Sequence, residues 1–182
     1  MNRFNLKSKK VVLLLLLLMF GIASCNQNNK NINVQKENAD ANIILKDYGP
    51  EPLVLDLETY TETNNNFRTA LWTGTNLQLT LMSIPIGCEI GLEMHPDTDQ
   101  FIRIEEGNAQ ILIGDSKDSL QLNQIANDGF AIIIPAGKWH NIINTGDKPL
   151  KVYSIYSPAE HPHSTIHKTF EEAEEAETKQ GD

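Results

Sequence analysis

Between residues 77 and 156, short runs in which apolar and polar residues alternate follow one another, separated by turn residues such as Pro, Gly, Asn and Asp. Side chains two apart on a strand lie on the same face, so each run predicts a strand with one buried face. Many short strands at this spacing are typical of an antiparallel sandwich or barrel, and about eight strands is near the number in a jelly roll. The predicted strands are residues 77–82, 90–95, 100–105, 109–113, 120–122, 130–134, 140–143 and 150–156.

The segments on either side of these runs are less regular. Residues 53–57 alternate leucine with other residues and predict one extra strand in a lead-in to the sheet. Near the C-terminus, Thr169 is followed three residues later by Glu172, which is the spacing of a capping box, within an acidic run that suits a helix N-terminus. We therefore expect an all-β fold with a short C-terminal helix that touches the body through Phe170 and Ala173.

The first residues have the composition of a targeting segment. Four basic residues precede the apolar run 11–20, and small residues then lead to Cys25. This is the anatomy of a secretory signal peptide, and the apolar stretch 11–23 is shorter than the roughly 20 residues that a spanning helix needs. Residues 22–25, Ile-Ala-Ser-Cys, resemble the bacterial lipobox, in which the cysteine is lipidated and becomes the mature N-terminus. The resemblance implies a lipoprotein signal at residues 1–24 and lipid attachment at Cys25; an ordinary signal peptide or an uncleaved anchor is the alternative.

Cleavage after residue 24 would change the charge and the cysteine content. It removes four basic and no acidic residues, which moves the formal net charge from −9 to −13 and argues against a nucleic-acid partner. With Cys25 lipidated, Cys88 is the one cysteine left, so no intrachain disulfide is expected. The expected location is the bacterial cell envelope, with the domain in the periplasm and the membrane reached only through the N-terminal lipid.

Composition also divides the rest of the chain. Residues 25–42 are rich in Asn, Gln and Lys and poor in apolar residues, so they predict a flexible tether. A single domain is expected at residues 43–160, with its core at 74–157, and residues 161–182 form a C-terminal tail and helix.

Glu93, His95 and Gln100 are the strongest candidates for chemistry. On a strand, Glu93 and His95 project to the same face, and the polar connection 96–99 is of the kind that folds a hairpin. Such a hairpin would bring Gln100 back beside His95. Three donor side chains placed in this way are either solvated surface residues or ligands that close on one metal ion.

Two spaced motifs resemble those of the cupin superfamily. The first motif usually reads Gly, five residues, His-x-His, three or four residues, Glu, six residues, Gly. Its positions hold Gly87, Glu93, His95, Gln100 and Gly107. The second motif matches at every defined position, with Gly129, Pro135, Gly137, His140 and Asn144. The resemblance covers about residues 74–157 and extends to small single-domain cupins often labelled mannose-6-phosphate isomerase-like. It implies the cupin double-stranded β-helix, a jelly-roll sandwich or barrel, with metal ligands at Glu93, His95, Gln100 and His140.

The first motif departs from the usual pattern at two ligand positions. Glu93 replaces the first histidine and Gln100 replaces the glutamate, so the carboxylate has moved within the set and its charge is kept. Two imidazoles, one carboxylate and one amide oxygen suit a divalent metal ion such as Fe, Mn, Ni, Zn or Co. The alternative is a cupin that has lost its metal, in which Gln100 only hydrogen-bonds to a water.

Three further histidines follow the last predicted strand. His161, His163 and His167 are secondary candidates for metal binding or proton transfer. Such a segment is more often a docking tail, because flexible histidine clusters bind metal loosely.

Three classes of function remain open for such a chain. The first is a metal-dependent enzyme of the oxygenase or isomerase type that acts on a small polar molecule, since two histidines and one carboxylate are compatible with oxygenase chemistry. The second is a non-catalytic module that binds a sugar or another small molecule while tethered to the envelope, and the third is a structural metal site. The edge strands of such a sandwich make a homodimer a further hypothesis.

Overall fold

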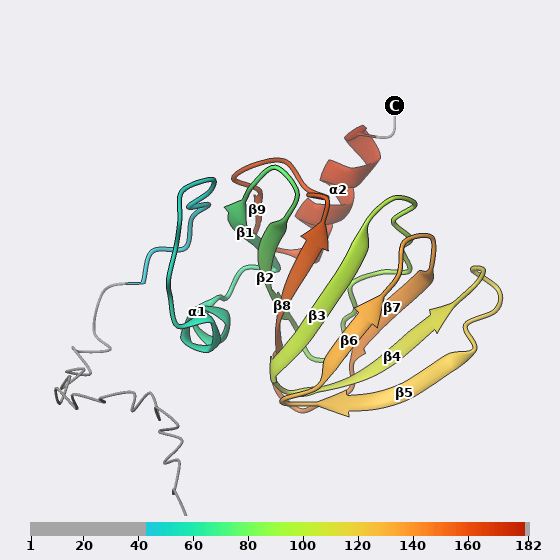
Figure 1. The fold of residues 1–182 in the computed structure, drawn as a ribbon. Coiled ribbons are helices and arrows are strands. Elements are labelled where there is room, and N and C mark those ends of the chain that lie inside the picture. Colours follow the sequence, from blue (N-terminus) through green and yellow to red (C-terminus); the bar gives the residue numbers. More distant parts are fainter. Residues whose placement is uncertain (1–42, 181–182) are drawn as a thin grey trace, which may run out of the picture. The chain divides into compact units, whose positions relative to one another are not determined.

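Residues 43–180 are described by a computed structural model, and within them two antiparallel sheets face each other (Figure 1). The larger sheet has the strand order β6-β3-β8-β2-β1-β9, and the smaller sheet has the order β5-β4-β7. The predicted all-β fold with a C-terminal helix is confirmed, and a second helix, α1, precedes the first strand. The strands are β1 (Arg68–Thr73), β2 (Gln78–Ile84), β3 (Asp99–Glu106), β4 (Asn108–Gly114), β5 (Leu122–Asn127), β6 (Ala131–Ile134), β7 (Trp139–Asn144), β8 (Leu150–Ser157) and β9 (Ile166–His167), and the helices are α1 (Leu57–Thr63) and α2 (Phe170–Gln180).

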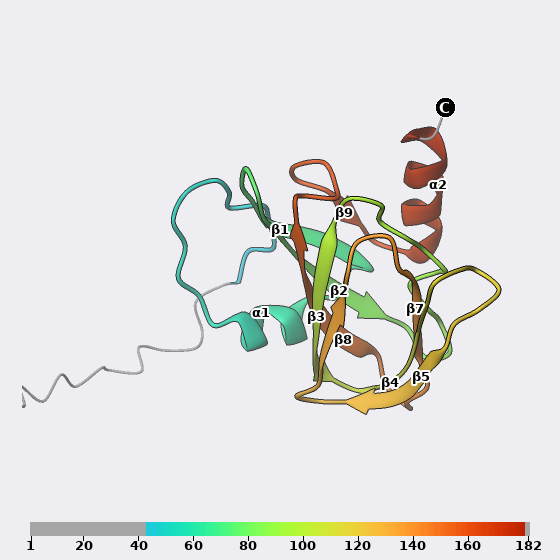
Figure 2. The same ribbon diagram turned by 45° about the vertical axis from the view of Figure 1, so that its right-hand side comes forward.

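Most of the predicted strands are present, with ends shifted by one or two residues. In the turned view of Figure 2, β4, β5 and β7 stand apart from the strands of the larger sheet, with the interior between them. The predicted signal peptide, the lipidation site and the tether lie outside the described residues.

The predicted strand at residues 90–95 is wrong. Residues 85–98 form a loop between β2 and β3, which pairs with β7 only at isolated bridges, one of them between Glu93 and His140. Gly91 interrupts the loop with a φ of 95°, a backbone conformation that a strand does not use but that glycine adopts at no steric cost. The loop nevertheless keeps Glu93 beside β7.

The predicted strand at residues 53–57 is also wrong. Residues 43–56 contain no helix or strand, and α1 begins at Leu57. Asp56 caps this helix, because its Oδ1 accepts a hydrogen bond from the Thr59 N–H at 3.3 Å. The alternating leucines belong to the approach to the helix and do not form a strand.

The strands that the alternation misses are those without one buried and one exposed face. β5 begins at Leu122, where the predicted strand 120–122 ends, and most of its residues are exposed. β1 buries four successive residues at its start, so its sequence has no two-residue period. The short β9 pairs with β1 at the edge of the larger sheet.

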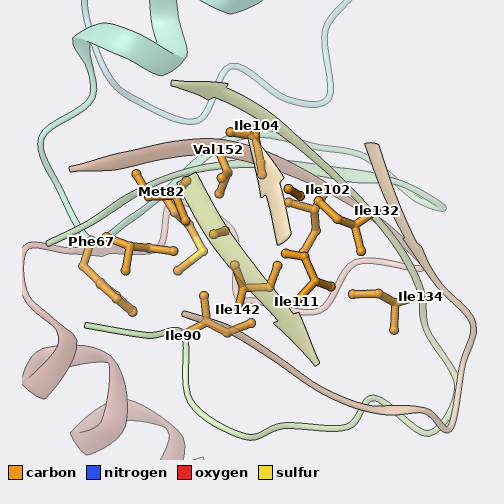
Figure 3. Packing of buried hydrophobic residues seen from close by; sticks show 14 of the residues in the cluster. Phe67, Met82, Ile90, Ile102, Ile104, Ile111, Ile132, Ile134, Ile142 and Val152 are labelled. Carbon is orange, nitrogen blue, oxygen red and sulfur yellow. The ribbon is translucent and has the colours of Figure 1, made fainter. Parts of the chain in front are cut away.

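Side chains on the inner face of the larger sheet change from apolar to polar along the strands. Cross-strand partners on β2, β8 and β3 form three successive rows, Met82–Val152–Ile104, Thr80–Ser154–Ile102 and Gln78–Tyr156–Gln100. The first row lies in the buried hydrophobic cluster that also contains Ile111 and Ile142 of the smaller sheet (Figure 3). Full burial of one such side chain contributes about 1.5–3 kcal/mol to stability. One end of the interior is therefore a hydrophobic core, and the other end is polar.

The C-terminal helix α2 begins where the sequence predicts. The Thr169 hydroxyl accepts a hydrogen bond from the Glu172 N–H at 3.3 Å, and the Glu172 carboxylate accepts one from the Lys168 N–H at 2.6 Å. Ala173 is buried in the core and Phe170 packs against it, which confirms the predicted contacts of the helix with the body.

The carboxylate of Asp47 joins the lead-in to two distant segments. It accepts hydrogen bonds from the N–H and the hydroxyl of Thr73 (2.9 and 2.6 Å), from the Ser164 N–H (3.1 Å) and from the Gly49 N–H (2.9 Å). Burial alone would raise the pKa of Asp47, but the hydrogen bonds from Thr73, Ser164 and Gly49 outweigh it and lower the pKa below its ordinary value.

Replacing Asp47 with asparagine is expected to reduce the free energy of unfolding by about 1–3 kcal/mol at neutral pH, because the part-buried N–H groups of Thr73 and Gly49 lose a charged acceptor. A carboxyl group with a lowered pKa in the folded state contributes stability above its unfolded pKa of about 4, and this contribution is lost as the pH falls through the folded value. The difference between the two proteins should therefore shrink below about pH 4. Urea unfolding at several pH values measures this, with the exposed Asp118→Asn as the control. A difference that does not change with pH would contradict the expectation.

Candidate metal centre

The candidate ligands Glu93 and His95 lie in the loop 85–98, which the backbone fastens to neighbouring elements. The Glu93 N–H donates to the His140 carbonyl at 3.0 Å, and the His140 N–H donates to the Glu93 carbonyl at 2.9 Å. The His95 carbonyl accepts a hydrogen bond from the Gly137 N–H at 2.8 Å. These hydrogen bonds place the side chains of the loop next to the side chain of His140 on β7, although the loop is not a strand.

The three side chains of Glu93, His95 and His140 converge. One ligand atom from each lies within 4.8 Å of the other two, and within residues 43–180 this is the one such group of His, Cys, Asp or Glu residues. Glu93 Oε1 is 3.4 Å from His95 Nε2 and 3.3 Å from His140 Nε2. The predicted convergence of these three residues is present, with both histidines buried.

The other nitrogen of each imidazole is already engaged. His140 Nδ1 lies 3.0 Å from the Lys138 carbonyl oxygen, and His95 Nδ1 lies 3.0 Å from Glu160 Oε1. Because both partners are acceptors, each Nδ1 carries its proton, and a neutral ring then has a lone pair at Nε2. Two lone pairs and a carboxylate oxygen that meet at one point need a cation or a proton between them.

The charges of this cluster shift the pKa values of its members. Burial alone would lower the pKa of His95, but Glu160 and Glu93 raise it to about 9. Burial alone would raise the pKa of Glu93, but the imidazoles of His140 and His95 hold it well below its usual range. A proton on His95 therefore balances the carboxylates, and a metal ion has to displace that proton.

Gln100, the fourth predicted ligand, lies on β3 in the polar row of the larger sheet and is 2 % exposed. Its Nε2 donates a hydrogen bond to the Tyr156 hydroxyl at 3.0 Å. Its Oε1 is buried and has no hydrogen-bond partner. A buried amide oxygen without a partner costs about 1–3 kcal/mol, and a metal ion would satisfy it. The donor set of two imidazoles, one carboxylate and one amide oxygen thus fits a divalent ion of the first transition row.

The three secondary candidates do not come together. His161 is turned inward against the Tyr156 ring, with the ring centroids 5.2 Å apart, and burial with the charge of Arg68 lowers its pKa to about 3. His163 is exposed on the surface, and His167 lies on β9 at the edge of the larger sheet. The three histidines therefore have different environments and form no common site.

Two charged residues near the centre are not predicted from the sequence. Glu160 contacts His95 but lies beyond the last position of the second motif. Arg68, on β1, is 1 % exposed, and its charge helps to lower the pKa of Glu93. Neither residue belongs to a spaced motif, and a buried arginine in a strand of apolar residues gives no signal of its place in the fold.

Known proteins resemble this chain in both sequence and fold. The family described as a cupin domain matches residues 80–156. The uncharacterized protein YrkC of Bacillus subtilis (strain 168) is 54% identical over 138 residues, which cover 76% of this chain and 74% of that protein. The crystal structure of BH2720 from Bacillus halodurans is 52% identical, with a TM-score of 0.71, and the match covers 71% of this chain and 98% of that one.

A more distant structure supports the fold alone. An uncharacterized conserved protein with a double-stranded beta-helix domain from Klebsiella pneumoniae is 17% identical, with a TM-score of 0.50, and the match covers 64% of this chain and 92% of that one. The matched family, the sequence relative and the shared fold agree with the two spaced motifs. This chain belongs to the cupin superfamily.

Proposed function

We propose that this protein binds a divalent metal ion at Glu93, His95, Gln100 and His140 and uses it as an enzyme of the oxygenase or isomerase type on a small polar molecule. One observation carries the proposal: Glu93 Oε1 lies 3.4 Å from His95 Nε2 and 3.3 Å from His140 Nε2. The Nδ1 atom of each of these two rings already has a hydrogen-bond partner, so each Nε2 is available to an ion. A bound ion of this kind supplies Lewis-acid polarisation of a substrate oxygen or, where it is redox-active, one-electron chemistry.

The residues beside the centre support a polar ligand. Thr80 and Ser154 are cross-strand partners in the middle row of the larger sheet, and both are fully buried. The Thr80 hydroxyl oxygen has no hydrogen-bond partner, and the Ser154 hydroxyl has a side-chain hydrogen bond only to Tyr156. Buried hydroxyls are normally satisfied by protein, by ordered water or by a ligand. A small molecule that carries hydroxyl, carbonyl or carboxylate groups would satisfy them, whereas an apolar molecule would not.

Elemental mass spectrometry of the full-length chain, purified in a mild detergent, tests metal binding. We expect near-stoichiometric Fe, Mn, Ni, Zn or Co after purification or after loading of the chelator-treated protein. Failure to bind any of these ions under any loading condition would overturn the proposal. Once the ion is known, oxygen-dependent and isomerase reactions can be screened with it.

A non-catalytic binding module is the second candidate. Each of the two carboxylates at the centre already contacts an imidazole: Glu93 contacts His140 and His95, and Glu160 contacts His95. Isomerisation needs a general base in addition to the ion, and neither carboxylate is uncommitted. Binding of a sugar with no turnover by the metal-loaded protein would favour this second function.

The resemblance to mannose-6-phosphate isomerase-like cupins does not add that activity, because sugar phosphates are mostly cytoplasmic metabolites and the leader favours export.

We also propose that the protein is a lipoprotein of the bacterial envelope, held in the periplasm through Cys25. The order of basic, apolar and small residues before Cys25 supports this proposal. Within residues 43–180, none of the helices has the length and apolar character that crossing a membrane requires.

Lipidation at Cys25 predicts a direct labelling result. In a bacterial host supplied with labelled palmitate, the parent protein should incorporate the label and Cys25→Ser should lose it, because the thiol is the attachment atom. Cys88→Ser is the matched control and should keep the label. Equal labelling of the parent and Cys25→Ser would contradict lipid attachment at this residue.

A homodimer is proposed through the edges of the two sheets. β5 and β6 are edge strands, and Leu122, Phe130 and Ile133 beside them are 43, 44 and 73 % exposed. These three side chains line one hollow of about 130 Å³. Light scattering should give twice the monomer mass, and Ile133→Glu should give the monomer mass because a charge would then enter an apolar interface. The exposed Val54→Glu is the control, and a monomeric parent protein would contradict the proposal.

A further inference from the structure

Glu160 lies after the end of β8, outside both cupin motifs, yet it contacts one of the candidate ligands. Its Oε1 lies 3.0 Å from His95 Nδ1. The side chain of His95 is 10 % exposed and that of Glu160 is 27 % exposed, so the contact is largely shielded from solvent. A carboxylate that accepts the Nδ1–H of a histidine is the usual outer partner of a metal-bound imidazole.

A buried glutamine fixes the backbone that carries Glu160. Gln78, on β2, is fully buried, and its Oε1 accepts hydrogen bonds from the Glu160 N–H (3.2 Å) and the His161 N–H (2.9 Å). Its Nε2 donates to the His161 carbonyl at 2.8 Å. The amide of Gln78 thus binds this segment as the backbone of a neighbouring strand would. The Ser157 hydroxyl, which donates to the Asn76 carbonyl at 3.0 Å, fixes the start of the same segment.

The two imidazoles of the centre have unlike outer partners. His140 Nδ1 faces the neutral carbonyl of Lys138, whereas His95 Nδ1 faces the carboxylate of Glu160. A charge-assisted hydrogen bond is shorter and roughly twice as strong as a neutral one, and it makes the imidazole a more basic ligand. The affinity of His95 for an ion therefore depends on the side chain of Glu160, which can be replaced without changing the ligand itself.

We propose that Glu160 is a positioning residue of the metal centre, which holds His95 by its Nδ1–H so that the Nε2 lone pair points at the ion. This inference rests on the proposed metal-binding function. It assigns the segment after β8 to the centre: Gln78 fixes Glu160, and Glu160 orients His95. Together with Glu93 it also places two negative charges around a doubly charged ion, one directly on the ion and one through the imidazole.

The affinity of the full-length protein for Co²⁺, measured by competition with a chromogenic chelator, tests the inference. Glu160→Ala should weaken binding about 10- to 100-fold, which is the range that the loss of an outer partner causes. Glu160→Gln keeps an oxygen that can accept the Nδ1–H but removes the charge, so its affinity for Co²⁺ should lie between that of the parent protein and that of Glu160→Ala. Glu89→Gln is the matched control, because the Glu89 carboxylate accepts its hydrogen bond from Asn141 Nδ2, at 2.7 Å, and not from a candidate ligand. This substitution should leave the affinity unchanged.

A second readout reports the hydrogen bond itself. In the Zn²⁺-loaded parent protein, the Nδ1–H of His95 should give a downfield proton resonance protected from exchange with water. This resonance should be absent in Glu160→Ala and retained in Glu89→Gln. A residue that acted only on overall stability would lower the melting temperature without this loss.

The outcomes separate the inference from the function on which it rests. A parent protein that binds neither Co²⁺ nor Zn²⁺ would overturn the proposed function. A parent protein that binds Co²⁺, with Glu160→Ala and Glu160→Gln binding it equally well, would overturn the role of Glu160 alone. Circular dichroism checks the fold of each variant, and if Glu160→Ala does not fold, the affinity of Glu160→Gln decides.

Discussion

Replacing His140 with alanine is expected to weaken metal binding by more than about 100-fold, because the loss of an outer partner of a ligand already costs 10- to 100-fold. His140 is 1 % exposed, its ring is held by the Lys138 carbonyl, and its Nε2 faces Glu93. Elemental analysis of the purified variant should show little of the ion that the parent protein carries.

Glu93→Ala should have an equally large effect for a different reason. The set then loses its one negatively charged ligand, so the ion is bound only by neutral groups. His163→Ala is the matched control, because His163 is an exposed histidine whose removal leaves the centre intact. If His140→Ala and Glu93→Ala carried as much metal as His163→Ala, the ion would be bound elsewhere and the assigned centre would be wrong.

Replacing Asn144 with alanine is expected to reduce the free energy of unfolding by about 3–5 kcal/mol, since several buried groups lose their partners at once. Asn144 is 2 % exposed at the end of β7. Its Nδ2 lies 2.9, 3.1 and 2.9 Å from the carbonyl oxygens of Ile84, Pro85 and Lys148, and its Oδ1 accepts from the Gly146 N–H at 2.9 Å. This one amide joins the end of β2 to the turn before β8.

Urea unfolding measures the effect of the Asn144 variants. Asn144→Asp is close in shape and keeps an acceptor but loses the Nδ2 donors, so it should also be destabilised. The exposed Asn123→Ala should change the free energy of unfolding by less than about 0.5 kcal/mol. Because a domain of this size is stable by only about 5–15 kcal/mol, the Asn144 variants should unfold at much lower urea concentrations. An Asn144→Ala protein as stable as Asn123→Ala would show that these hydrogen bonds contribute little.

The Asn144 variants should affect the centre indirectly as well. The side-chain Nδ2 of Asn144 donates to the carbonyl oxygens of Ile84 and Pro85, where the loop that carries Glu93 and His95 begins. This is the physical reason for the last defined position of the second cupin motif in this chain. The position holds the loop with the ligands against the strand that carries His140.

Sequence alone predicts those strands that have one buried and one exposed face. β3 is the clearest case, because Gln100, Ile102 and Ile104 are buried while the residues between them are partly exposed. β1 and β5 give no such signal, since the first is largely buried on both faces and the second is mostly exposed. The alternating leucines at 53–57 are misleading, because tertiary contacts and the Asp56 cap decide the local structure there.

The candidate site is predicted better than the local structure that carries it. The spacing of Glu93, His95 and His140 identifies the cluster even though the strand predicted at 90–95 is a loop, because backbone hydrogen bonds between Glu93 and His140 hold the loop where a strand would lie. Glu160 could not be predicted, since its contact with His95 depends on how Gln78 fixes the segment after β8. No local sequence pattern predicts that the segment after β8 comes back to the side chain of His95.

The four candidate ligands come from both halves of the sandwich. His140 lies on β7 of the smaller sheet, Gln100 lies on β3 of the larger one, and Glu93 and His95 lie on the loop between β2 and β3. An ion bound to all four would cross-link the two sheets from inside, as a disulfide would in a domain with paired cysteines. At a free-ion concentration of 100 times the dissociation constant, such binding adds about 2.7 kcal/mol to the free energy of unfolding. Metal supply in its compartment would then govern how long this protein survives heat and proteases, independently of any reaction at the centre.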